Sequence, residues 1–254
     1  MRNDLTLYER HAAEWWDPRA RAFASLRRTK EFQRAQLGRW LGPELAEALV
    51  VELGCGGGLL LCPLALHARA VVGIDLSLGS LAAARDHLPP GRRGLFARGD
   101  ALAPPLAGAC ADVVLISDVL EHVREPARMV AEAGRLLRPG GLLYVFTLNR
   151  TWRARLLAVH LAKGIGLVPR GTHDPALFLR PQEVRAMAQQ AGLLPVHAEG
   201  AAPRLLDTLR SWAIALRPAR ALAVSYGMLF VKGPCPPVPD EHGNAVAGPP
   251  LSRR

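Results

Sequence analysis

Short apolar runs alternate with longer mixed segments along the middle of the chain. Five such runs predict buried β-strands, because each is short and ends at glycine or at a polar residue. They span residues 49–53, 70–74, 94–97, 112–117 and 141–148. Helix-length segments lie between them, at residues 59–66, 78–88 and 126–137. Strands that alternate with helices imply crossover connections, a parallel sheet and helices on both of its faces.

Patterns outside this central part complete the predicted fold. Two N-terminal helices are expected at residues 7–16 and 29–41, the second ending at a Gly-Pro helix-stop signal. A helix at residues 181–191 and strands at 193–197 and 226–232 follow later. We therefore predict an α/β fold: a Rossmann-like, doubly wound sheet of seven strands with N-terminal helices and a helical lid insertion.

This reading divides the chain into five segments. They are the N-terminal helices (1–48), the α/β core (49–148), a lid or acceptor-binding insertion with its helix (149–192), the C-terminal strands (193–232) and a tail (233–254). Nine of the 22 tail residues are Gly or Pro, so we expect the tail to be disordered.

Composition narrows the class of protein. The chain has 254 residues, of which 50% are hydrophobic, and a net charge of +10 that favours anionic partners. Its four cysteines form no CxxC pair, which is typical of reduced thiols. The charged N-terminus does not resemble a signal peptide, and no uncharged run is long enough to span a bilayer. We expect a cytoplasmic protein.

A glycine-rich turn follows the first predicted strand, which ends near Glu52. Gly54, Gly56 and Gly58 would let the backbone turn sharply and approach a ligand closely. A dinucleotide fingerprint would need glycine where Leu59 stands, and no Gly-Lys-Ser/Thr of a P-loop follows. The turn therefore indicates another nucleotide-like ligand.

Acidic residues stand at the ends of three successive strands. Besides Glu52, Asp75 ends the second strand, and a carboxylate there can accept both hydroxyls of a ribose. Asp100 follows the third strand, where it could accept a hydrogen bond from an adenine amino group. The carboxyl ends of parallel strands are where such sheets bind ligands.

A family resemblance is carried by four segments, VELGCGGG (51–58), VVGIDLS (71–77), DVVLISDVLEH (112–122) and RLLRPGG (135–141). Together they resemble the class I S-adenosylmethionine-dependent methyltransferases. Closer similarity to the ubiquinone-biosynthesis O-methyltransferases lies in Trp15-Trp16-Asp17, Leu120-Glu121-His122, Thr147-Leu148-Asn149-Arg150 and the PRGTHD run at 169–174. The resemblance covers about residues 8–192. It implies S-adenosylmethionine as the cofactor and a polyprenyl hydroxyphenol or demethylubiquinol as the methyl acceptor.

The resemblance also implies roles for single residues. Arg34 falls at a cofactor-contacting arginine, Gly54 and Asp75 at the turn and ribose positions, and Ser117 beside the adenine. A carboxylate–carboxylate–histidine set that binds Mg²⁺ in eukaryotic members falls on Asp118, Glu121 and His122.

Two readings of that last set stay open. Its spacing would place all three side chains on one side of a helical turn, as a metal site needs, or would make Asp118 and Glu121 a capping box. The phenol, with a pKa of about 10, needs a cation or a base. The candidate bases are His122 and His173, and His173 could equally be an ordinary loop histidine.

The segment 149–172 holds five Lys or Arg and no acidic residue, among apolar residues that share no single helical face. It is either a surface for an anionic membrane, which would give a peripheral position on the inner face, or a lid whose arginines face water. The rival functions are methylation of another small-molecule acceptor, methylation of nucleic acid, and cofactor binding without catalysis. Nucleic acid is disfavoured because no RNA-binding module is present and aromatic residues make up only 6%.

Overall fold

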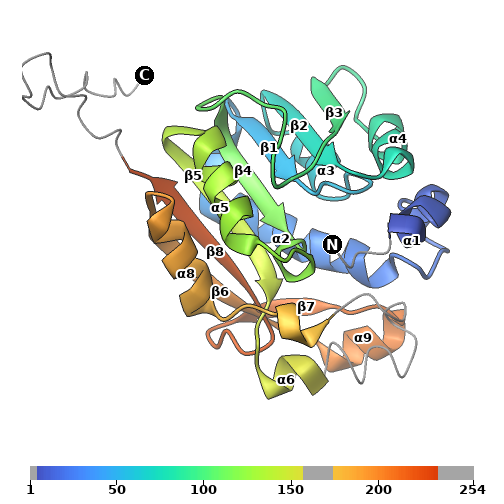
Figure 1. Ribbon diagram of the computed structural model, residues 1–254. Helices are drawn as coiled ribbons and strands as arrows, with labels where there is room; N and C mark the ends of the chain where they lie inside the picture. The colour runs from blue at the N-terminus through green and yellow to red at the C-terminus, as the bar shows by residue number, and fades with distance from the viewer. Residues whose placement is uncertain (1–4, 157–173, 234–254) are drawn as a thin grey trace, which may run out of the picture.

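The computed structural model describes residues 5–156 and 174–233 of the chain (Figure 1). The strands are β1 (Leu49–Leu53), β2 (Ala70–Asp75), β3 (Gly94–Arg98), β4 (Ala111–Ser117), β5 (Leu137–Leu148), β6 (Leu193–Pro203), β7 (Leu216–Ala219) and β8 (Ser225–Lys232). The α-helices are α1 (Leu5–Arg10), α2 (Ala24–Leu41), α3 (Leu61–Leu64), α4 (Leu78–Asp86), α5 (Pro126–Leu136), α6 (Trp152–Ala154), α8 (Pro181–Gln190) and α9 (Leu205–Ser211). Short 3₁₀ helices are η1 (Ala12–Glu14), η2 (Gly42–Leu45), η3 (Leu120–His122) and η5 (Pro175–Leu177).

All these strands form one sheet in the order β3-β2-β1-β4-β5-β8-β6-β7 (Figure 1). Strands β1 to β5 pair in parallel, whereas β8 pairs antiparallel with both β5 and β6, and β7 pairs antiparallel with β6. The predicted doubly wound α/β fold is confirmed. The sheet has one strand more than the seven predicted, because β7 is the four-residue sequence LRPA, which lacks a β pattern and carries a proline suited to an edge.

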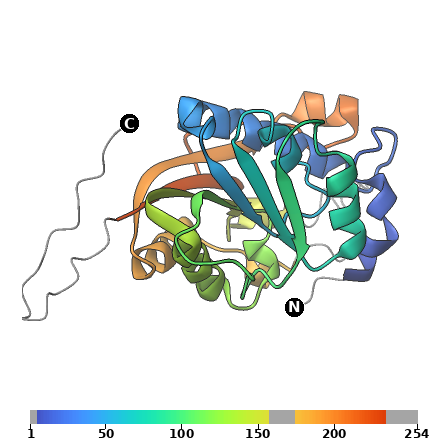
Figure 2. The same ribbon diagram turned by 90° about the horizontal axis from the view of Figure 1, so that it is seen from above.

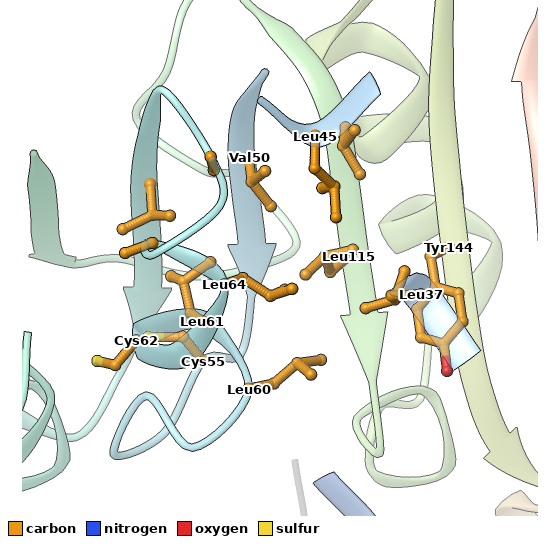
Figure 3. Close-up of a cluster of buried hydrophobic side chains, with 14 of the residues drawn as sticks. Leu37, Leu45, Val50, Cys55, Leu60, Leu61, Cys62, Leu64, Leu115 and Tyr144 are labelled. Atoms are coloured by element: carbon orange, nitrogen blue, oxygen red, sulfur yellow. The ribbon is translucent and has the colours of Figure 1, made fainter. Parts of the chain in front are cut away.

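Helices cover both faces of the sheet (Figure 2). On one face α2, α3 and α4 pack against alternate strand residues such as Val50 and Leu115. Figure 3 shows part of this cluster, with Leu60, Leu61 and Leu64 directed toward the strands. On the other face α5 and α8 pack against the intervening residues, such as Val51 and Val114. The alternation within single strands explains why they read as continuous apolar runs: both faces are buried.

Several element boundaries differ from those predicted. The helix expected at 59–66 is reduced to α3, since the chain is still turning at Gly58. The helix expected at 7–16 ends at Arg10 and is followed by η1, while α2 begins at Ala24, five residues earlier than expected. Within the described ranges no helix is long and apolar enough to cross a membrane.

Candidate active site

A cleft lies at the carboxyl ends of β1, β2, β3 and β4. It is lined by seven of the residues singled out from the sequence: Gly54, Gly56, Asp75, Asp100, Ser117, Asp118 and His122. The N-terminal part of the chain supplies further lining residues, Tyr8, Trp15, Leu26 and Lys30, of which only Trp15 was noted in the sequence, without a role in the cleft. Strand ends that converge on one cleft are the usual ligand site of such sheets.

The glycine-rich turn has the backbone conformation that requires glycine. Gly54, Gly56 and Gly58 have φ values of 76°, 51° and 76°, in the left-handed region that other residues rarely adopt. Gly54 and Gly56 line the cleft, but Gly58 does not. A Cβ at Gly58 would lie 2.6 Å from Cys62 Sγ and 2.9 Å from Ala84 Cβ. Gly58 therefore serves the close packing beneath the turn rather than ligand contact.

Trp15 packs directly on this turn. A Cβ added at Gly56 would lie only 2.6 Å from Trp15 Cη2, and a Cβ at Gly57 would also collide with the indole. The Trp15 Nε1 donates a hydrogen bond to Ser80 Oγ at 3.0 Å. The ring stacks on Phe23 with centroids 4.0 Å apart. The neighbouring Trp16 Nε1 donates to the Gly57 carbonyl at 2.7 Å. Glycine is therefore required at positions 56 and 57 partly because Trp15 packs there, and not only because a ligand approaches.

Asp75 organises the turn as well as facing the cleft. Its Oδ2 accepts a hydrogen bond from the Gly56 N–H at 2.8 Å, and its Oδ1 accepts from the Ser77 N–H at 2.9 Å. Burial raises the pKa of this carboxyl, and the backbone donors act in the opposite direction. Each carboxylate oxygen has a second lone pair, so both oxygens can still accept from a ligand hydroxyl.

Lys30 of α2 lines the cleft, unlike Arg34, for which the resemblance implies a cofactor contact. Arg34 is exposed and does not line the cleft, because it lies one turn further along α2. Lys30 is only 8% exposed, and its Nζ lies 3.1 Å from the Ser117 carbonyl and 3.0 Å from Asp118 Oδ2. A signal was present in the sequence: lysine is rare in this arginine-dominated chain.

The set Asp118, Glu121 and His122 does not form one helical turn. Asp118 has φ 55° and precedes η3, which begins at Leu120 without a side-chain cap, so the capping-box reading is wrong too. Asp118 Oδ2 instead accepts from Gln33 Nε2 at 2.7 Å and is paired with Lys30. Glu121 Oε2 accepts from Thr147 Oγ1 at 2.7 Å.

These contacts do not suit Mg²⁺. Among the described residues, no three His, Cys, Asp or Glu side chains are grouped so that they could hold a metal ion. Lys30 already supplies a positive charge beside Asp118. Burial and the neighbouring Asp118 raise the pKa of Glu121 to about 8, which favours its neutral form at neutral pH.

His122 faces the cleft as a neutral imidazole. Burial lowers its pKa to about 4, although Asp118 acts against this shift. The imidazole is therefore neutral, with a single N–H, at neutral pH. The other candidate base, His173, lies outside the described residues.

Glu52 lies under the turn rather than in the cleft. It is 1% exposed and does not line the cleft, unlike the predicted ligand-facing carboxylate. Burial raises its pKa to about 8, while Lys30 acts to lower it. Its Oε2 has no hydrogen-bond partner within the described part of the chain. Strand β1 is buried on both faces, so the Glu52 side chain is enclosed whichever face it points to.

Comparison with known proteins matches this architecture. A family model described as a methyltransferase domain matches residues 51–145, which span β1 to β5. The chain is 38% identical over 196 residues to the ubiquinone biosynthesis O-methyltransferase of Thiobacillus denitrificans, covering 75% of this chain and 82% of that protein. The enzyme of the same description from Methylococcus capsulatus is 38% identical over 208 residues, covering 78% and 83%.

The chain belongs to the ubiquinone biosynthesis O-methyltransferase family. The resemblance seen in the sequence is thereby confirmed. Among solved structures, the magnesium protoporphyrin IX methyltransferase of Synechocystis PCC 6803, with bound SAH, superposes with a TM-score of 0.63 at 21% identity. The match covers 90% of this chain and 95% of that one and shows a shared methyltransferase fold. The cleft at the strand ends is therefore the candidate site for methyl transfer.

Proposed function

We propose that this chain is an S-adenosylmethionine-dependent O-methyltransferase that methylates a polyprenylated phenol or catechol in ubiquinone biosynthesis. The observation that carries the proposal is the joint finding of family membership and a cleft that gathers Gly54, Gly56, Asp75 and Asp100 at successive strand ends. The relative with bound SAH supports the same cofactor class. Methylation of a water-soluble phenolic compound is the alternative.

The residues that line the cleft support S-adenosylmethionine as its ligand. Bound S-adenosylmethionine would supply an electrophilic methyl group on a sulfonium. Asp75 is suited to the ribose hydroxyls, because its oxygens retain acceptor capacity. Asp100 is exposed at the next strand end and is suited to the adenine amino group. Lys30, rather than Arg34, is the cation suited to the methionine carboxylate of the cofactor. Ser117 and Asp118 hold the Lys30 ammonium group in place.

The acceptor needs a base rather than covalent help. Methyl transfer is an in-line displacement, so positioning of the two reactants contributes most of the rate. His122 is the candidate base that lies in the described wall of the cleft, and its position there supports a role in taking the phenol proton, although burial lowers its pKa to about 4 and so weakens it as a base. His173 stays a second candidate. No step is assigned to a metal ion, because Asp118 and Glu121 are engaged otherwise.

A peripheral position on an anionic membrane follows from a prenylated acceptor. The described start of the 149–172 segment supports it: Trp152 is 70% exposed, Leu156 is 44% exposed, and the Arg153 guanidinium lies 5.3 Å from the Trp152 ring centre. Exposed tryptophan beside arginine is typical of the lipid–water interface.

The test is transfer of a radiolabelled methyl group to three acceptors: a long-chain polyprenyl catechol in vesicles, a soluble catechol and RNA. We expect product only from the catechols, with the prenylated one preferred, and at least a hundredfold loss of kcat for His122→Ala at unchanged cofactor affinity. Asp86→Asn, an exposed change at the end of α4, is the control. Turnover of the soluble catechol alone would favour the alternative, and turnover of RNA would refute the proposal.

A further inference from the structure

Helix α9 presents its apolar residues to solvent. Leu205, Leu206, Leu209 and Trp212 are 67%, 71%, 57% and 43% exposed, and we call these four residues the α9 surface. Leu205 and Leu209 lie one turn apart and share one side of α9, Trp212 follows at its C-terminal cap, and Thr208 is buried. Figures 1 and 2 both place α9 at the periphery of the molecule. Apolar residues gathered in this way mark an interaction surface.

Arginines flank the residues of the α9 surface along the chain. Exposed arginines in this stretch are Arg204, Arg210, Arg217 and Arg220. The single acidic residue between positions 204 and 220 is Asp207, and its Oδ2 lies 2.9 Å from Arg204 Nε. The local charge is therefore strongly positive. Exposed leucines and a tryptophan in a stretch that also carries exposed arginines suit a partner that is apolar inside and anionic at its surface.

Hydrogen bonds fix this surface next to the cleft. The Arg204 N–H donates to the Ala215 carbonyl at 2.8 Å, which closes the loop around α9. The Ile214 N–H donates to Ser25 Oγ at 3.1 Å, which ties that loop to the start of α2. The next residue of α2, Leu26, lines the cleft. The loop after α9 is thus attached to the helix that contributes Leu26 to the cleft wall.

We propose that the α9 surface docks on an anionic lipid bilayer, with its leucines and Trp212 at the acyl boundary and its arginines on headgroup phosphates. The inference rests on the proposed peripheral location, and it names a contact outside the 149–172 segment. A second copy of the chain fits less well, because a twofold contact would bring the same arginines face to face.

Vesicle flotation of the full chain tests the proposal, with phosphatidylglycerol-containing vesicles compared with pure phosphatidylcholine vesicles at two salt concentrations. The variant is Leu206→Glu with Leu209→Glu, at exposed positions where glutamate suits a helix. The control carries the same change at Leu66 and Leu95, which are 47% and 56% exposed elsewhere on the surface. We expect the wild type and the control to float with anionic vesicles, and the α9 variant to bind at least about tenfold more weakly.

Other outcomes separate this inference from the proposed function. Unchanged flotation of the α9 variant, with loss in Arg153→Glu plus Arg155→Glu, would overturn the α9 contact and leave membrane association standing. A wild type that ignores anionic vesicles would overturn both, although methyl transfer to a soluble catechol would still report on catalysis. A dimer that the α9 substitutions dissociate, without vesicle binding, would identify a second copy as the occupant and overturn the proposal.

A second measurement covers the case in which the double variant does not fold. Brominated anionic lipids should quench the tryptophan fluorescence of the wild type more than that of Trp212→Phe. The reason is that Trp212 of the bound wild type would reach the acyl boundary, where the bromine atoms lie. Equal fractional quenching of the two proteins would overturn the proposal.

Discussion

Gly57→Ala tests the contact between the N-terminal tryptophan and the glycine-rich turn. The backbone of Gly57 is not in the left-handed region, so alanine is permitted by its dihedral angles. The new Cβ would lie 2.5 Å from Trp15 Cδ2 and 2.8 Å from Trp15 Cβ, far inside van der Waals contact. The variant must therefore displace the indole.

The indole has little room to move. Trp15 is 4% exposed, stacks on Phe23 and donates to Ser80 Oγ. Loss of an aromatic stack costs about 0.5–1.5 kcal/mol, and loss of a hydrogen bond costs about 0.5–1.5 kcal/mol. The free energy of unfolding should therefore fall by about 1–3 kcal/mol, the range of an overpacked core. Because Trp15 also lines the cleft, cofactor affinity should fall as well.

Urea unfolding followed by circular dichroism measures the first effect, and titration calorimetry with S-adenosylmethionine the second. Gly38→Ala is the matched control: it lies in α2, where a Cβ meets nothing within 4 Å, so it should stabilise the chain by up to about 1 kcal/mol. In a double-mutant cycle, Trp15→Ala should make the Gly57→Ala change nearly free of cost. Wild-type stability and affinity in Gly57→Ala would refute this account of the turn.

The remaining predictions concern charge. Asp75→Asn should weaken S-adenosylmethionine binding by about tenfold or more in calorimetry, because a charge-assisted hydrogen bond contributes about 1.5–3 kcal/mol; an affinity equal to that of Asp86→Asn would contradict this. Chelator treatment should leave turnover unchanged, and restoration of lost activity by Mg²⁺ would refute the view that Lys30 satisfies the charge of Asp118. Since the pKa of Glu52 is about 8 in the fold against an ordinary 4.5, the folded chain binds the extra proton, and stability should fall as the pH rises from 6.5 to 8. Because the pKa of Glu121 is also raised to about 8, Glu52→Gln should remove only the contribution of Glu52 to that decline in unfolding experiments at a series of pH values; an equally steep decline would count against it.

Local patterns were enough to predict the sheet and its ligand-binding edge. Each strand of the parallel half is buried on both faces, so it appears as an apolar run, and its end is marked by glycine or an acidic residue. Asp75 and Asp100 could be placed in the cleft because a strand end fixes where the next side chain points. The edge strand β7 has no such pattern and escaped prediction.

The N-terminal wall of the cleft depends on contacts between distant parts of the chain. Trp16 meets Gly57 across 41 positions, and Trp15 meets Ser80 across 65. No periodicity within the first 23 residues encodes those partners, although the paired tryptophans themselves were visible. Sequence reasoning assigned a covering role to the 149–192 segment instead, whereas the described structure shows Tyr8 and Trp15 forming part of the cleft wall.

The metal site that the resemblance implied as one alternative at Asp118, Glu121 and His122 is not supported by the structure, for the same physical reason. Spacing of three and four residues puts side chains together only if the backbone is helical throughout, and Asp118 departs from that at φ 55°. Once Asp118 turns away, the partner for its charge comes from α2, where Lys30 is 88 positions earlier in the chain. A buried carboxylate must be paired with a positive charge. The Lys30 ammonium, from a helix distant in the chain, supplies that charge to Asp118 as a bound metal ion would. The acceptor would then meet one wall that combines a fixed positive charge with the neutral imidazole of His122.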